Sequence, residues 1–130
     1  MKEKFDDKFK SYTKKLVEEY RTLIFASEYE IDIKFEWEDS DNFAEIRIDT
    51  KYLNATLSIY KPLYKEYKAN GKKAFAKIIL HEICHLLTEP QYDDTMKIFN
   101  GKLLHNDTIN DTRERQTQRV TNALWALLDK

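Results

Sequence analysis

A His-Glu-x-x-His motif inside an apolar run constrains this chain more than any other feature. The run covers residues 78–90, Ile-Ile-Leu-His-Glu-Ile-Cys-His-Leu-Leu-Thr-Glu-Pro, and the motif is His81, Glu82 and His85. On a helix, side chains four residues apart lie one above the other, so both imidazoles can face one metal ion with Glu82 beside them. Neutral imidazole nitrogens bind Zn²⁺, and a catalytic zinc site keeps one position open for water. The motif therefore predicts a helix that holds one catalytic zinc ion, with Glu82 as the general base.

The residues around the motif favour this prediction over a chance spacing of two histidines. The chain has only three histidines in 130 residues. Two imidazoles and a carboxylate buried in an apolar helix are costly unless they have partners. Cys84, next to His85, points about 100° away around the helix, so we expect a buried core residue and not a ligand. The apolar residues that surround the motif are Ile78, Ile79, Leu80, Ile83, Leu86 and Leu87.

Residues 79–87, Ile-Leu-His-Glu-Ile-Cys-His-Leu-Leu, resemble the active-site helix of zincin metallopeptidases. The rest of the chain is similar to the small single-domain zincin-like proteins found in phage and prophage genomes. This resemblance implies a zinc-dependent peptidase with a helix, a small sheet, the zinc helix and a closing helix.

Length and composition set limits on the fold and on the partners. A chain of 130 residues fits one domain, so we expect residues 1–130 to form a single unit with a shallow substrate cleft. Its 22 Lys and Arg balance 23 Asp and Glu, which disfavours binding to nucleic acid or anionic lipid. No apolar run approaches the roughly 18 residues of a membrane span, the N-terminus has no signal-like segment, and the single cysteine fits a reducing compartment. We therefore expect a cytoplasmic protein that acts on a peptide or protein.

The first half of the chain shows a helical period followed by strand periods. Apolar residues at steps of three and four predict an amphipathic helix over residues 4–26. Alternation then predicts strands over residues 29–38, 44–49 and 53–60, and the short polar link at residues 39–42 favours antiparallel pairing of the first two. In zincins the edge strand over the zinc helix binds the substrate backbone, so the resemblance makes residues 53–59 a candidate edge, with an ordinary strand as the equal alternative.

The second half is predicted to be helical. Residues 63–68 suggest a short helical turn, and Asn70-Gly71 precedes a zinc helix that begins near Lys72 and ends at Pro90. Residues 91–110 lack a clear period, and we expect a partly helical excursion there. A last amphipathic helix starts between Thr108 and Asp111 and runs to the C-terminus. The predicted fold is α+β, with an antiparallel or mixed sheet of three to four strands.

A catalytic zinc usually takes three protein ligands, so one more must come from elsewhere. The metzincin extension is excluded because it requires Gly and His where Thr88 and Gln91 stand. Glu89 is disfavoured because Pro90 is expected to end the helix at that point. Glu114 precedes Thr117 and Thr121 at helical steps, which directs it toward the buried face of the last helix.

The place of Glu114 in the sequence resembles that of the third zinc ligand in the gluzincin branch of zincins, which is a Glu on a helix downstream of the motif. Asp111 and His105 stay open as alternative ligands, and Glu114 could instead pair with surface cations. His105, Tyr92 and Tyr60 are the candidate donors to a developing oxyanion.

The sequence thus predicts a zinc-dependent peptidase with His81, His85 and Glu114 as ligands and Glu82 as base. The alternative is a zinc-containing binding or regulatory module without catalytic activity, which a closed site with four protein ligands would favour. A weaker alternative is a protease that acts on proteins bound to DNA, which the near-neutral charge and the lack of a Cys-rich ribbon disfavour.

Overall fold

The computed structural model describes the backbone of residues 5–24, 26–99 and 106–128, and the side chains of this set except residues 89–113. The fold belongs to the α+β class, as predicted, with four helices and one three-stranded sheet in this part of the chain. The elements in chain order are α1 (Asp7–Leu23), β1 (Glu30–Glu36), β2 (Ala44–Asp49), β3 (Asn54–Tyr60), α2 (Lys61–Asn70), α3 (Lys72–Phe99) and α4 (Asn106–Leu128).

The sheet is mixed, and its order is β1-β3-β2. β3 pairs in parallel with β1 and antiparallel with β2. The predicted antiparallel pairing of β1 with β2 is therefore wrong, as is the prediction that residues 53–59 form the edge. The physical reason lies in the inner face of β3, where Ala55, Leu57 and Ile59 are almost completely buried, whereas the inner residues of β1 are only half-buried. Placing the most apolar strand at the centre of the sheet buries the most apolar surface. In addition, the link at residues 37–43 is longer than a tight hairpin turn requires.

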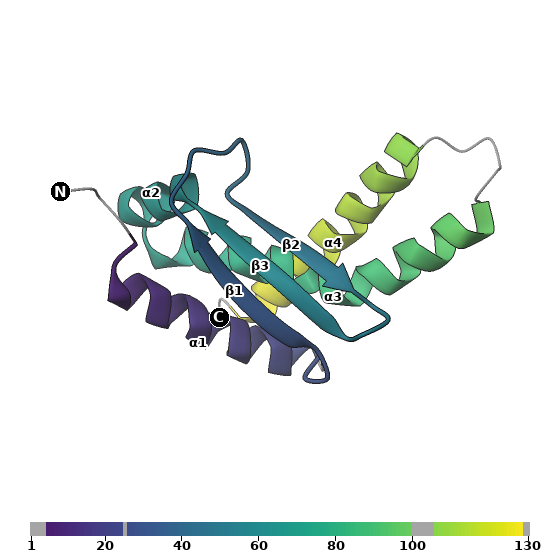
Figure 1. The fold of residues 1–130 in the computed structure, drawn as a ribbon, viewed down its shortest axis with the longest axis horizontal. Helices are drawn as coiled ribbons and strands as arrows, with labels where there is room; N and C mark the ends of the chain where they lie inside the picture. Colours follow the sequence, from purple (N-terminus) through teal and green to yellow (C-terminus); the bar gives the residue numbers. More distant parts are fainter. Residues whose placement is uncertain (1–4, 25, 100–105, 129–130) are drawn as a thin grey trace.

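The inner face of the sheet is apolar in register across all three strands. Because side chains alternate between the two faces, aligned residues form rows that cross the sheet. In Figure 1 this sheet lies over α1 and α3, so the rows form one side of the core. The rows, written as β1, β3, β2, are Phe35, Ile59, Ala44; Ile33, Leu57, Ile46; and Ile31, Ala55, Ile48.

An aromatic cluster packs the end of the molecule where α1 meets α2. We define this aromatic cluster as Phe5, Phe9, Tyr64, Tyr67 and Phe75. The ring centroid of Phe9 lies 4.9 Å from that of Tyr64 and 4.9 Å from that of Phe75. Phe5 and Phe9 also contact Phe35 of β1, which ties α1 to the sheet.

α1 begins later than predicted because Asp6 caps it. The Asp6 carboxylate accepts a hydrogen bond of 2.7 Å from the backbone N–H of Phe9, which satisfies one of the free donors of the first turn. The same carboxylate accepts a hydrogen bond of 2.9 Å from the Tyr64 hydroxyl and lies 3.4 Å from Lys68 Nζ. These contacts join the start of α1 to α2, which is itself longer than the short turn predicted at residues 63–68.

α3 differs from prediction at its C-terminal end. Gly71 has φ +87°, a left-handed conformation that glycine adopts without steric cost, and it separates α2 from the start of α3 near the predicted position. The predicted end at Pro90 is wrong, because α3 continues through it to Phe99. A proline inside a helix removes one backbone hydrogen bond and costs about 3 kcal/mol. α3 packs on α4. Among the described helices none is long and apolar enough to cross a membrane.

Candidate metal centre

α3 carries the motif residues on neighbouring turns, as the four-residue spacing predicted. The rings of His81 and His85 lie with centroids 5.2 Å apart and planes 87° to each other. His85 is buried, whereas His81 and Glu82 are half-buried. This burial arises because the sheet covers one side of α3 and α4 another (Figure 1).

α4 places Glu114 against both histidines. Its two carboxylate oxygens lie 3.2 Å from His81 Nε2 and 3.4 Å from His85 Nε2. The carboxylate itself is half exposed. Thr117 and Thr121 follow Glu114 at steps of three and then four and are completely buried, so Glu114 lies at the border of the buried face of α4.

Between α3 and α4 lies a set of buried hydroxyls that we call the threonine seam, made of Thr88, Thr117 and Thr121. The Thr117 hydroxyl lies 3.3 Å from His85 Nδ1 and 2.7 Å from the Thr88 hydroxyl. The Thr121 hydroxyl donates to the backbone carbonyl of Thr117. His81 differs from His85, because its Nδ1 is buried with no hydrogen-bond partner among the described residues.

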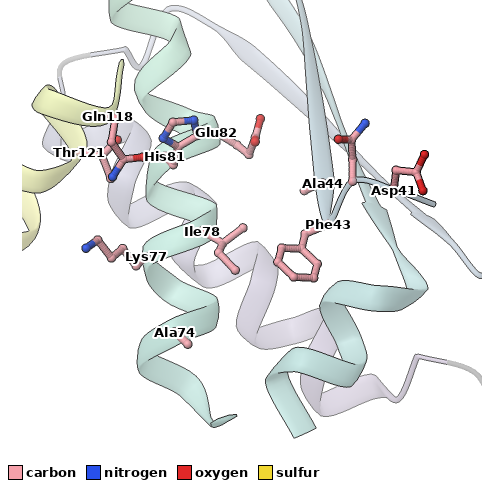
Figure 2. A pocket seen from close by; sticks show the side chains of 11 residues that line it. Asp41, Phe43, Ala44, Ala74, Lys77, Ile78, His81, Glu82, Gln118 and Thr121 are labelled. Atoms are coloured by element: carbon pink, nitrogen blue, oxygen red, sulfur yellow. The ribbon is translucent and has the colours of Figure 1, made fainter. Parts of the chain in front are cut away.

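Two clefts meet at Glu82, between α3 and the edge strand β2. The apolar cleft has a volume of about 550 Å³, and Phe43, Ala44, Ala74 and Ile78 form its walls. Figure 2 shows Phe43 facing Ile78 across this cleft, and Glu82 directed from α3 toward the β2 end where Ala44 lies.

The polar cleft has a volume of about 610 Å³ and runs along β2 past Glu45 and Arg47 to His85 and Glu114. Glu82 and Ala44 line both clefts. A molecule that occupied both would therefore pass directly beside the Glu82 carboxylate.

Three of the residues brought together could hold a metal ion. His81, His85 and Glu114 each offer one ligand atom, and these atoms lie within 4.8 Å of one another. Two imidazole nitrogens and one carboxylate oxygen are a ligand set of catalytic zinc, which leaves a fourth position for water. Glu82 is the neighbouring carboxylate, and it points away from these three residues, toward the clefts.

The other residues singled out in the sequence lie away from this centre or outside the described part. Asp111, Tyr92 and Glu89 have side chains outside the described residues, and His105 lies outside them altogether. Tyr60 lines neither cleft, because it projects from β3 on the face opposite Ile59, where its hydroxyl donates to Glu45 over 3.1 Å. Burial, followed by the contact with Glu45, raises the pKa of the Tyr60 phenol.

Sequence reasoning identified the motif but missed the threonine seam. The sequence spacing could have indicated it, because Thr88 follows His85 by three residues and Thr117 follows Glu114 by three. This spacing places each hydroxyl one helical turn beyond a proposed site residue. Cys84, by contrast, is the buried core residue that was predicted, and burial raises the pKa of its thiol.

Known proteins give no further guidance to this site. Comparison of the chain with protein families, with curated proteins and with solved structures finds no match.

Proposed function

We propose that this chain is a zinc-dependent peptidase in which His81, His85 and Glu114 hold one zinc ion and Glu82 is the general base. The observation that carries the proposal is the convergence of three ligand atoms from two helices, beside a fourth acidic residue that borders an open cleft. When bound, the ion supplies a Lewis acid for the substrate carbonyl and makes water acidic enough to attack it.

Glu82 supplies the proton transfers. It follows His81 directly in the sequence, so on the helix its carboxylate lies beside the ligand pair and not within it. From there it accepts a proton from the attacking water and passes it to the leaving amine.

The edge strand β2 is the proposed binding surface for the substrate backbone. It pairs with β3 on one side, and no other described strand pairs with its second side. An extended peptide can add to such an edge through backbone hydrogen bonds, while alternate side chains enter neighbouring pockets. Because both clefts lie between β2 and α3, a peptide bound there passes Glu82 and the three proposed ligands.

One cleft has mainly apolar walls and the other is mainly polar, so we expect the proposed substrate to carry different kinds of side chain on the two sides of the scissile bond. Phe43 is 43% exposed although it is a large apolar residue, and it faces Ile78 across the apolar cleft. An apolar substrate side chain at that position would bury this surface. We expect polar side chains on the other side of the scissile bond, where Glu45 and Arg47 line the polar cleft.

The test compares wild type with Glu82→Gln at equal zinc content on a mixed peptide library. Gln keeps the size and one oxygen but cannot accept a proton, so cleavage should fall by about 10²- to 10⁴-fold while zinc content and fold are unchanged. Glu66→Gln is the matched control, because Glu66 lies on α2, lines neither cleft, and accepts a hydrogen bond from Asn70 that Gln preserves.

The outcomes separate the candidate functions. Equal cleavage by wild type and Glu82→Gln would mean that Glu82 is not the base. Stoichiometric zinc without cleavage by wild type would favour the binding or regulatory module instead.

A further inference from the structure

His85 is held from both sides of its ring. Its Nε2 faces Glu114 Oε1 at 3.4 Å, and its Nδ1 faces the Thr117 hydroxyl at 3.3 Å. The imidazole is only 8% exposed and Thr117 is completely buried, so water does not readily replace the contact between them. Rotation of the ring by 180° would put carbon atoms where the nitrogens now lie and leave the Thr117 hydroxyl facing a C–H group.

Metal binding through Nε2 would fix the direction of the hydrogen bonds between His85, Thr117 and Thr88. A neutral imidazole that binds a metal through Nε2 carries its proton on Nδ1, which makes Nδ1 a donor. The Thr117 oxygen then accepts this proton, and its own O–H remains to donate to Thr88, 2.7 Å away. Both hydroxyls are thereby used in one consistent chain of hydrogen bonds, from His85 through Thr117 to Thr88.

We infer that Thr117, supported by Thr88, is a positioning residue that holds His85 with Nε2 directed at the proposed zinc site. The inference rests on the proposed function, because it assigns a role toward that zinc ion. It also explains why the site depends on the contact between two helices: α4 supplies Glu114 and, one turn later, the hydroxyl that orients a ligand on α3. Groups that hydrogen-bond to the second nitrogen of a ligand histidine typically change metal affinity by about 10- to 100-fold.

His81 provides an internal contrast. Its Nδ1 has no hydrogen-bond partner among the described residues, and its side chain is 21% exposed. The threonine seam therefore acts on one of the two histidines. A variant of Thr117 should change the behaviour of His85 and leave that of His81 largely unchanged.

The first measurement uses the metal-free chain, so that it does not depend on zinc binding. In protein labelled with ¹⁵N-histidine, the ring-nitrogen shifts report which nitrogens carry protons and hydrogen bonds. Thr117→Val keeps the shape of the side chain but removes the hydroxyl, and should change the His85 shifts. Thr117→Ser keeps the hydroxyl and should restore them.

The second measurement is zinc affinity, determined by competition with a chromophoric chelator. Thr117→Val should weaken binding by about 10-fold, at the low end of the usual range for such groups. Thr117→Ser should stay close to wild type, and Thr88→Val should weaken binding by less than Thr117→Val because it removes only the second acceptor. Thr13→Val is the control for loss of a buried hydroxyl, since Thr13 is completely buried and donates to the Phe9 carbonyl in α1.

Three results would overturn the inference: unchanged His85 shifts in Thr117→Val, wild-type zinc affinity in that variant, or failure of Thr117→Ser to restore either property. Failure of the proposed function looks different. If wild type binds no zinc but the His85 shifts still depend on the Thr117 hydroxyl, the zinc site is wrong and Thr117 remains the residue that orients His85.

Discussion

The aromatic cluster where α1 meets α2 and the threonine seam between α3 and α4 are both buried, but different contacts hold them. In the aromatic cluster, rings pack against rings, as Phe9 does against Tyr64 and Phe75 with centroids 4.9 Å apart. In the threonine seam, Thr117 makes hydrogen bonds of 2.7 Å to Thr88 and 3.3 Å to His85. Ring packing removes apolar surface from water in any orientation that fills space, whereas a hydrogen bond needs one geometry.

The comparison teaches that stability and function are served by different parts of one core. The aromatic cluster supplies free energy of folding, because large buried side chains carry most of it. The threonine seam supplies position, because the contacts of Thr117 with Thr88 and with His85 both require α4 to sit on α3 at one register. That register is also what places Glu114 beside the two histidines.

The largest effect should come from the histidines themselves. His81→Ala or His85→Ala should abolish stoichiometric zinc binding, since two protein ligands hold zinc poorly. Zinc should also raise the thermal unfolding midpoint of wild type but not of either variant, because only a ligand that binds the folded state stabilises it. Metal analysis and thermal unfolding check this, and one zinc per chain in either variant would exclude the site as described.

The next effect tests the other side of the comparison. Phe9→Ala should lower the free energy of unfolding by about 3 to 5 kcal/mol, because it removes a completely buried ring from the aromatic cluster. Zinc affinity of the folded protein should not change. Urea unfolding and the chelator competition measure the two quantities separately, and a loss of zinc affinity in folded Phe9→Ala would show that the two parts of the core are coupled.

Phe43→Ala is the matched variant for Phe9→Ala, because it removes the same ring from an exposed position in the apolar cleft. It should leave the unfolding free energy nearly unchanged and weaken cleavage of peptides with an apolar side chain beside the scissile bond. A large loss of stability without a change in peptide preference would remove the argument for an apolar substrate side chain.

A smaller effect is expected at Glu114. Glu114→Gln keeps a neutral oxygen but loses the charge, so zinc affinity should fall by roughly 10- to 100-fold, comparable to changes around a metal site. The side chain is half exposed, so the metal-free variant should unfold at the wild-type midpoint. Asp111→Asn and His105→Ala are the discriminating variants: if one of them loses zinc and Glu114→Gln does not, the third ligand is that residue.

The smallest effect concerns Asp6 and its dependence on pH. The hydrogen bonds from the Phe9 backbone and the Tyr64 hydroxyl, with Lys68 nearby, lower the pKa of the Asp6 carboxyl below its ordinary value. A folded pKa below the unfolded one contributes stability above the unfolded pKa, and this contribution is lost as pH falls through the folded pKa. Asp6→Asn keeps the helix cap but not the charge, so it should unfold a few degrees below wild type near pH 6 and at the same midpoint well below about pH 3. A pH-independent difference would assign the effect to the cap alone.

Several features of the fold and the site were predictable because they depend on neighbours in the sequence. Apolar spacing gave the helices and the strand faces, since side chains on one face recur at fixed steps. The same reasoning predicted that Glu114 points toward the buried face of its helix, and the structure leaves it half exposed beside the completely buried Thr117. The strand order was not predictable in this way, because β3 lies between β1 and β2 for reasons of burial across the whole sheet.

By itself, the sequence determined the chemistry available to this protein: a helix with His81, Glu82 and His85 in fixed relation, set in an apolar run. Only the tertiary structure decided what surrounds that helix. The position of β2 as the edge beside the clefts and the hydrogen bond between His85 and Thr117 depend on contacts between segments far apart in the chain. Local periodicity fixes which way a side chain points on its own helix, but the free energy of packing fixes which side chains of other segments it contacts.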